Sequence, residues 1–241
     1  MIWFPKINSA SSAPYRLFCL PYAGGGASVF LPWRPRFAPK VEVCPVQLPG
    51  RESRFSEPLF TQLDPLVDAL TTAIEPYLDR PYALLGYSLG AIVAFELARK
   101  LREQDLKKPS CLFAVACRAP QLPDLESPLH KLPDAEFIEA LRKLQGIPEG
   151  VLQNSELMEL YLPILRTDLK IFETYRYTNG QSFNFPIKAY GGLEDKKASQ
   201  EQLQGWAEQS THSFSLKMVP GHHFFVDQLF KALQQDLREF P

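Results

Sequence analysis

The chain has 241 residues, with 26 lysines and arginines against 27 aspartates and glutamates, and 45% of its residues are apolar. This composition excludes wholesale disorder, and the net charge of −1 excludes the basic surface typical of proteins that bind nucleic acid or anionic membranes. Short apolar runs predict buried parallel strands at residues 15–20, 41–47, 82–85, 111–117, 187–190 and 213–219. Apolar residues at helical spacing predict helices at residues 63–78, 89–101 and 226–237. Such alternation indicates an α/β fold, with a mostly parallel central sheet and helices on both faces.

Residues 120–185 interrupt this alternation. They contain no convincing core strand, only helical patterns at 134–144, 155–160 and 164–175, and they are too many for a plain loop. We therefore expect a single domain over residues 1–241, with a helical lid inserted at about 120–185.

The chain shows no sign of export or of membrane insertion. No apolar run approaches the roughly 20 residues of a membrane span, and the first residues lack the pattern of a secretory signal. The four cysteines lie in apolar runs without C-x-x-C spacing, which favours buried free thiols. We expect a cytoplasmic protein.

The sharpest motif is GYSLG at residues 86–90, which fits G-x-S-x-G and lies directly between a predicted strand and a predicted helix. The glycines permit a tight turn there, so that Ser88 projects its hydroxyl above the sheet, as the nucleophile of an α/β-hydrolase does.

A serine nucleophile needs a base, and the chain has four histidines. In this scheme the histidine follows the last strand, which selects the adjacent His222 and His223 over His130 and His212, both expected at the surface. The residues alone do not decide between the two neighbours. No second ligand cluster accompanies the pair, so we expect no metal.

The acid is expected after the strand at 187–190, where the turn GGLED carries Glu194 and Asp195. Either carboxylate could orient the imidazole; we favour Asp195, with Glu194 as the alternative.

The glycine-rich turn after the first strand, LPYAGGGA at residues 20–27, fits neither a P-loop nor a dinucleotide fingerprint. In a hydrolase this turn supplies one backbone N–H of the oxyanion hole, and the residue after the nucleophile supplies the other. These positions are Ala23 and Leu89.

Four motifs together carry a family resemblance: LPYAGGGA (20–27), LPGRE (48–52), GYSLG (86–90) and PGHHFF (220–225). With GIPE (146–149) and LRTDL (165–169) in the insertion, the chain resembles the type II (external, editing) thioesterases of nonribosomal peptide and polyketide synthases. The resemblance implies an α/β-hydrolase fold with a helical lid, selects His223 over His222, and supports Asp195.

The same resemblance implies hydrolysis of acyl thioesters from the phosphopantetheine arm of acyl- or peptidyl-carrier proteins by a Ser-His-Asp acyl-enzyme mechanism, without a cofactor. Alternatives are a medium-chain fatty-acyl carrier thioesterase, a carboxylesterase with the same triad, and a non-catalytic carrier-binding module. Arg51 and Arg54 could meet an acidic carrier, although isolated arginines are more often solvated. We expect a monomer.

Overall fold

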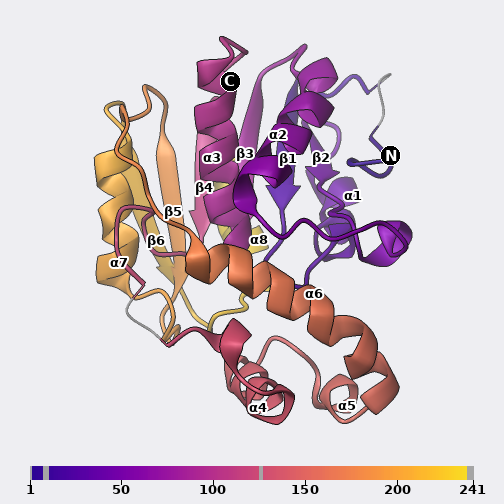
Figure 1. The fold of residues 1–241 in the computed structure, drawn as a ribbon. Helices are drawn as coiled ribbons and strands as arrows, with labels where there is room; N and C mark the ends of the chain where they lie inside the picture. The colour runs from indigo at the N-terminus through magenta and orange to yellow at the C-terminus, as the bar shows by residue number, and fades with distance from the viewer. Residues whose placement is uncertain (1, 8–10, 125–126, 238–241) are drawn as a thin grey trace.

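The computed structural model describes residues 2–7, 11–124 and 127–237, and in these residues six parallel strands form one sheet with the order β2-β1-β3-β4-β5-β6 (Figure 1). The strands are β1 (Tyr15–Leu20), β2 (Val41–Pro45), β3 (Tyr82–Tyr87), β4 (Cys111–Val115), β5 (Ile187–Gly192) and β6 (Phe214–Val219). The expected parallel α/β sheet is confirmed, with strand ends within two residues of the prediction. β4 ends two residues early because Ala116 adopts a positive φ of 48°, which extended backbone does not allow.

Helices cover both faces of the sheet. Helices α2 (Leu63–Ile74) and α3 (Leu89–Glu103) pack their apolar side chains on one face, and α1 (Arg34–Phe37) and α8 (Val226–Asp236) pack on the other. α3 is apolar almost all round because it is buried between the sheet and α2. The predicted helix at 63–78 ends at Ile74 and continues as a 3-10 turn that contains Pro76. The remaining short elements outside the insertion are α7 (Gln200–Gln204), η1 (Ala27–Val29), η2 (Leu31–Trp33), η3 (Glu52–Arg54), η4 (Glu75–Tyr77) and η6 (Gly205–Gln209).

The segment between β4 and β5, which we call the lid segment (residues 120–185), contains four helical elements in its described part. They are η5 (Leu129–Lys131), α4 (Asp134–Leu144), α5 (Glu149–Leu152) and α6 (Ser155–Thr174). They lie across the carboxyl ends of the strands, with α6 running nearest the sheet (Figure 1).

The prediction of two helices at 155–160 and 164–175 was wrong, since α6 is one continuous helix that contains Pro163. Proline removes one hydrogen bond to the residue four positions earlier. That residue is Glu159, which is exposed, so water can satisfy its carbonyl.

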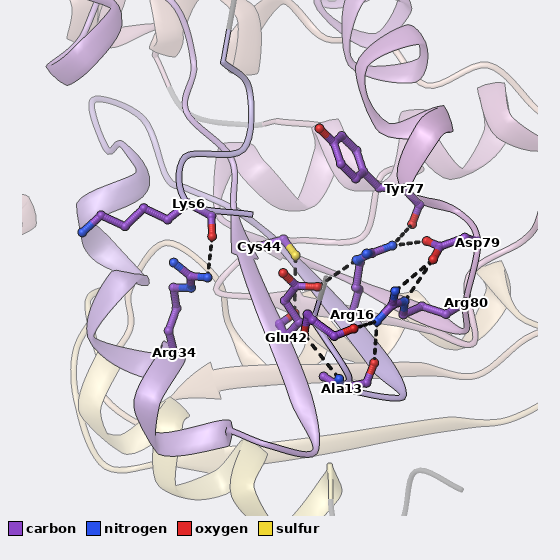
Figure 2. Close-up of polar contacts among 10 residues, drawn as sticks. Lys6, Ala13, Arg16, Arg34, Glu42, Cys44, Tyr77, Asp79 and Arg80 are labelled. Atoms are coloured by element: carbon purple, nitrogen blue, oxygen red, sulfur yellow. Dashed lines mark hydrogen bonds and ion pairs between the residues drawn. The ribbon is translucent and has the colours of Figure 1, made fainter. Parts of the chain in front are cut away.

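A polar network around the buried Arg16 joins the amino ends of the first three strands (Figure 2). This end of the sheet is opposite the lid segment (Figure 1). Arg16 of β1 donates through Nε to Glu42 of β2 (3.0 Å) and through Nη1 to the Tyr77 carbonyl (2.8 Å), and it also pairs with Asp79. The network fixes β1, β2 and the start of β3 relative to one another, so that the carboxyl ends of these strands are held in register.

No helix within the described residues is both long and apolar enough to cross a membrane.

Candidate active site

The turn between β3 and α3 places Ser88 at the carboxyl edge of the sheet. Ser88 has φ 52° and ψ −115°, a backbone conformation that non-glycine residues rarely adopt and that is stored at functional turns. A Cβ at Gly86 would lie 2.1 Å from the Gly90 carbonyl oxygen, and a Cβ at Gly90 would lie 2.3 Å from the carbonyl oxygen of Leu20. The two glycines are therefore required for the close approach of β3, α3 and the end of β1.

A series of hydrogen bonds links Ser88 to a histidine and an acid from other strand ends. His223, in the loop after β6, has Nε2 3.2 Å from Ser88 Oγ, and its Nδ1 is 2.9 Å from Asp195 Oδ2, in the loop after β5. Asp195 Oδ1 accepts hydrogen bonds from the N–H groups of Lys197 (2.8 Å) and Ala198 (3.3 Å). Because a carboxylate only accepts, the proton of a neutral His223 lies on Nδ1, which leaves Nε2 to accept from the serine hydroxyl.

The other acid and the other histidines considered from the sequence are exposed or make different contacts. Glu194 is exposed, and its Oε2 accepts from the Gly221 N–H (2.6 Å), so it ties the histidine loop to the β5 loop without touching the imidazole. His222 and His212 are exposed. The expectation of a surface position was wrong for His130, whose Nδ1 lies 2.5 Å from Glu173 Oε2 on α6, with both side chains largely buried.

Tyr87, the residue before Ser88, holds the loop that carries His223 by two hydrogen bonds. Its hydroxyl donates to the His223 carbonyl (2.7 Å) and accepts from the Phe225 N–H (2.8 Å). The side chain is fully buried, and burial raises the pKa of the Tyr87 phenol, so it stays protonated and keeps both bonds. The only sequence feature that indicates this role is the position of Tyr87 directly before Ser88 in the GYSLG motif.

The two predicted oxyanion donors lie beside the serine. Ala23 and Leu89 line a small cavity of about 120 Å³ together with Ser88 and His223. Within the described residues, neither the Ala23 N–H nor the Leu89 N–H donates a hydrogen bond to another protein group. Both donors are thus available to a ligand beside Ser88 Oγ.

Ser88 lines two cavities of different size. The walls of the small cavity are mixed, with Arg118, Lys197 and Gln202 among apolar side chains. A larger cavity of about 370 Å³ extends from Ser88 and His223 under the lid segment. Its walls are mostly apolar and include Leu141, Ile147, Met158, Tyr161, Leu165 and Leu169. Its size and apolar lining suit a small organic ligand.

Arg51 and Arg54, considered for carrier docking, are both buried with 4% of their surface exposed. Arg51 pairs with Asp168 of α6, and Arg54 pairs with Glu57 (2.6 Å). Neither guanidinium is available to a partner. The sequence contained one signal for the Arg51 pair, because Asp168 falls on the buried stripe of α6, four residues after Ile164.

Comparison with known proteins decides the family. A model of the thioesterase domain family matches residues 15–238, which is nearly the whole chain. The chain belongs to the thioesterase family. Among its relatives, the gramicidin S biosynthesis protein GrsT of Aneurinibacillus migulanus is 45% identical over 224 residues, which cover 93% of this chain and 88% of GrsT.

Solved structures agree with this assignment. RedJ, a thioesterase from the prodiginine biosynthetic pathway of Streptomyces coelicolor, superposes with a TM-score of 0.89 at 34% identity, over 99% of this chain and 92% of RedJ. BorB, a type II thioesterase from the borrelidin biosynthetic cluster, gives 0.88 at 32% identity, over 99% of this chain and 98% of BorB. The expected resemblance to type II thioesterases and the α/β-hydrolase fold class are confirmed, and the chain is a thioester-hydrolysing enzyme.

Proposed function

We propose that this thioesterase hydrolyses acyl thioesters from the phosphopantetheine arm of acyl- or peptidyl-carrier proteins, and so removes misloaded or stalled acyl groups during nonribosomal peptide or polyketide synthesis. The observation that carries the proposal is the hydrogen-bonded series from Asp195 through His223 to Ser88, which opens into the apolar cavity under the lid segment. The biosynthetic pathways named for GrsT, RedJ and BorB support the substrate class.

In the first half-reaction, His223 Nε2 takes the proton of Ser88 while Oγ attacks the thioester carbonyl carbon. The oxyanion accepts hydrogen bonds from the N–H groups of Ala23 and Leu89, and Asp195 stabilises the imidazolium. Collapse of the intermediate breaks the C–S bond. The thiol of the carrier arm leaves with the proton from His223, and the acyl group remains on Ser88.

In the second half-reaction, His223 removes a proton from water, and the oxygen attacks the acyl-serine carbonyl. The same two N–H groups hold the second oxyanion. Collapse breaks the bond to Ser88 Oγ, which regains its proton from His223, and the free acid departs. Both half-reactions use the same donors, because the two intermediates carry their charge at the same position.

The two cavities suit the two parts of such a substrate. We assign the acyl chain to the larger, mostly apolar cavity under the lid segment, and the pantetheine arm to the small cavity, where Arg118, Lys197 and Gln202 offer polar groups to its amides. A monomer in the cytoplasm fits this role. All four cysteines are buried free thiols, as is usual for proteins of a reducing compartment.

The experiment compares hydrolysis of matched substrates: one acyl group as a carrier-bound thioester, as its free pantetheine thioester and as an oxygen ester. The proposal predicts the highest kcat/KM for the carrier-bound thioester and the lowest for the oxygen ester. A preference for the oxygen ester would indicate a carboxylesterase. A sharp optimum for medium-length acyl chains on the carrier would indicate a chain-terminating fatty-acyl thioesterase instead.

A further inference from the structure

A buried ion pair connects the lid segment to the glycine turn beside Ser88. Asp168 lies on α6 with 3% of its surface exposed, and both of its oxygens face Arg51, which follows β2 and is equally buried. Asp168 Oδ1 accepts from Arg51 Nη2 at 2.9 Å, and Oδ2 accepts from Arg51 Nη1. The pair therefore joins α6 to the loop after β2, and its two residues are 117 positions apart in the chain.

The same carboxylate also reaches the backbone next to the proposed oxyanion donor. Asp168 Oδ2 accepts a hydrogen bond from the Gly24 N–H at 2.8 Å, and Gly24 directly follows Ala23. Gly24 has φ +78°, and a Cβ added to it would lie 2.4 Å from Leu165 Cδ2, so α6 packs directly against this residue. On the other side of the turn, the Gly25 N–H donates to the Tyr22 carbonyl (2.9 Å). The first bond fixes the Ala23–Gly24 peptide, and the second ties the Gly24–Gly25 peptide to the Tyr22–Ala23 peptide, which carries the Ala23 N–H.

The charge balance of this contact also matters. A carboxylate near a developing oxyanion would oppose the reaction if its charge were uncompensated. The Arg51 guanidinium, which also donates to the Pro49 carbonyl (3.2 Å), supplies that compensation and holds Asp168 by two parallel bonds.

We propose that Asp168 is a positioning residue for the oxyanion hole: held by Arg51, it fixes the Gly24 N–H and thereby the orientation of the Ala23 N–H, so that the donor is in place only when α6 is seated on the glycine turn. This inference rests on the proposed role of Ala23. It also couples the lid segment to catalysis, because the helix that lines the acyl cavity through Leu165 also sets the geometry of the donor.

The test uses three variants of the full chain: Asp168→Asn, the double variant Arg51→Met/Asp168→Leu, and Tyr175→Phe. The double variant removes both charges together, which avoids an unpaired buried charge and keeps the fold, but it leaves the Gly24 N–H without its acceptor. Tyr175→Phe is the matched control, since Tyr175 donates to Glu96 (2.6 Å) and anchors the C-terminal end of α6, about two turns beyond Asp168, without a bond to the glycine turn.

For Asp168→Asn and the double variant, we expect kcat to fall by about 10- to 100-fold, as for a displaced oxyanion donor, with KM within about threefold of wild type. The affinity of an alkylboronic acid, whose tetrahedral adduct on the serine mimics the oxyanion, should fall by the same factor as kcat. Tyr175→Phe should leave both quantities unchanged.

Three results would overturn the inference: wild-type kcat in the double variant, a fall in kcat without a fall in boronic acid affinity, or an equal loss in Tyr175→Phe. Ser88→Ala, measured in parallel, separates this failure from failure of the proposed function. If Ser88→Ala is inactive while the Asp168 variants match wild type, the proposed function stands and the positioning role does not.

Discussion

Replacing Tyr87 with phenylalanine tests whether the loop that carries His223 is held by the strand that carries Ser88. The change removes one oxygen atom and keeps the aromatic contacts of the ring with Tyr22 and Phe224. Two buried hydrogen bonds disappear, one to the His223 carbonyl (2.7 Å) and one from the Phe225 N–H (2.8 Å). At about 1 kcal/mol each, the free energy of unfolding should fall by about 2 kcal/mol.

The same substitution should affect catalysis. The Ser88 Oγ to His223 Nε2 distance is 3.2 Å, already long for such a bond, so a loop shift of a few tenths of an ångström breaks it. We expect kcat to fall by about 10- to 100-fold with little change in KM. Urea denaturation would give the free energy of unfolding, and the melting temperature should fall by about 4–8 °C.

Tyr82→Phe provides a control on the same strand. The Tyr82 hydroxyl donates to the Lys107 carbonyl at the amino end of β3, away from Ser88. This variant should lose about 1 kcal/mol of unfolding free energy and no activity. If Tyr87→Phe behaved like Tyr82→Phe in both measurements, Tyr87 would be an ordinary core residue and the reasoning would be refuted.

Three further predictions concern other parts of the site and its support. Gly90→Ala should lower the free energy of unfolding, measured by urea denaturation, by about 1–3 kcal/mol, because the added Cβ would overlap the end of β1. The control is Gly150→Ala, whose added Cβ would meet no atom within 4 Å and should stabilise α5 by up to about 1 kcal/mol. Burial raises the pKa of Glu96, so the folded state holds its proton more tightly than the unfolded state. The free energy of unfolding of wild type relative to Glu96→Gln should therefore decrease as the pH rises from 4.5 through the folded-state pKa of Glu96. A difference that does not change with pH would contradict this. Asp195→Asn should lower kcat by roughly 10⁴-fold, the loss known for the equivalent change in a serine protease. The kcat of Glu194→Gln should stay within about tenfold of the wild-type value, because Glu194 does not contact the imidazole. The reverse order of the two losses would make Glu194 the acid.

The sheet and the order of the site residues could be predicted because they depend on local patterns. Strands β1 to β4 are fully buried and β5 nearly so, whereas the edge strand β6 alternates between exposed and partly buried residues. Each predicted site residue lies within four residues of a strand's carboxyl end. In a parallel sheet these positions meet at one edge, so strand ends at Ser88, Asp195 and His223 necessarily lie near one another. The choice of His223 over His222 depended on the family resemblance, because the residues alone do not distinguish two adjacent histidines in one turn, and the resemblance also supported the preference for Asp195 over Glu194.

The lid segment was predicted less well, for reasons visible in individual residues. The gap between the predicted helices at 155–160 and 164–175 contains Pro163, but the hydrogen bond that this proline removes belongs to the carbonyl of an exposed residue, and packing of Ile164 and Leu165 continues the helix. Arg51 was expected to be a solvated surface charge, because its partner Asp168 is 117 residues away in the chain and no sequence periodicity connects the two residues. Such long-range ion pairs depend on tertiary packing and leave only a weak trace, here a carboxylate on an apolar helical stripe.

The most direct test of the central claim is hydrolysis of an acyl-phosphopantetheinyl carrier protein by wild type and by Ser88→Ala, followed by intact-protein mass spectrometry. Rapid quenching of the wild-type reaction should reveal a transient increase in enzyme mass equal to the acyl group, and the carrier should return to its free thiol form. Ser88→Ala should fold with wild-type stability, show no acyl adduct, and leave the carrier acylated. Release of the acyl group by Ser88→Ala at the wild-type rate would contradict the acyl-enzyme mechanism at this site.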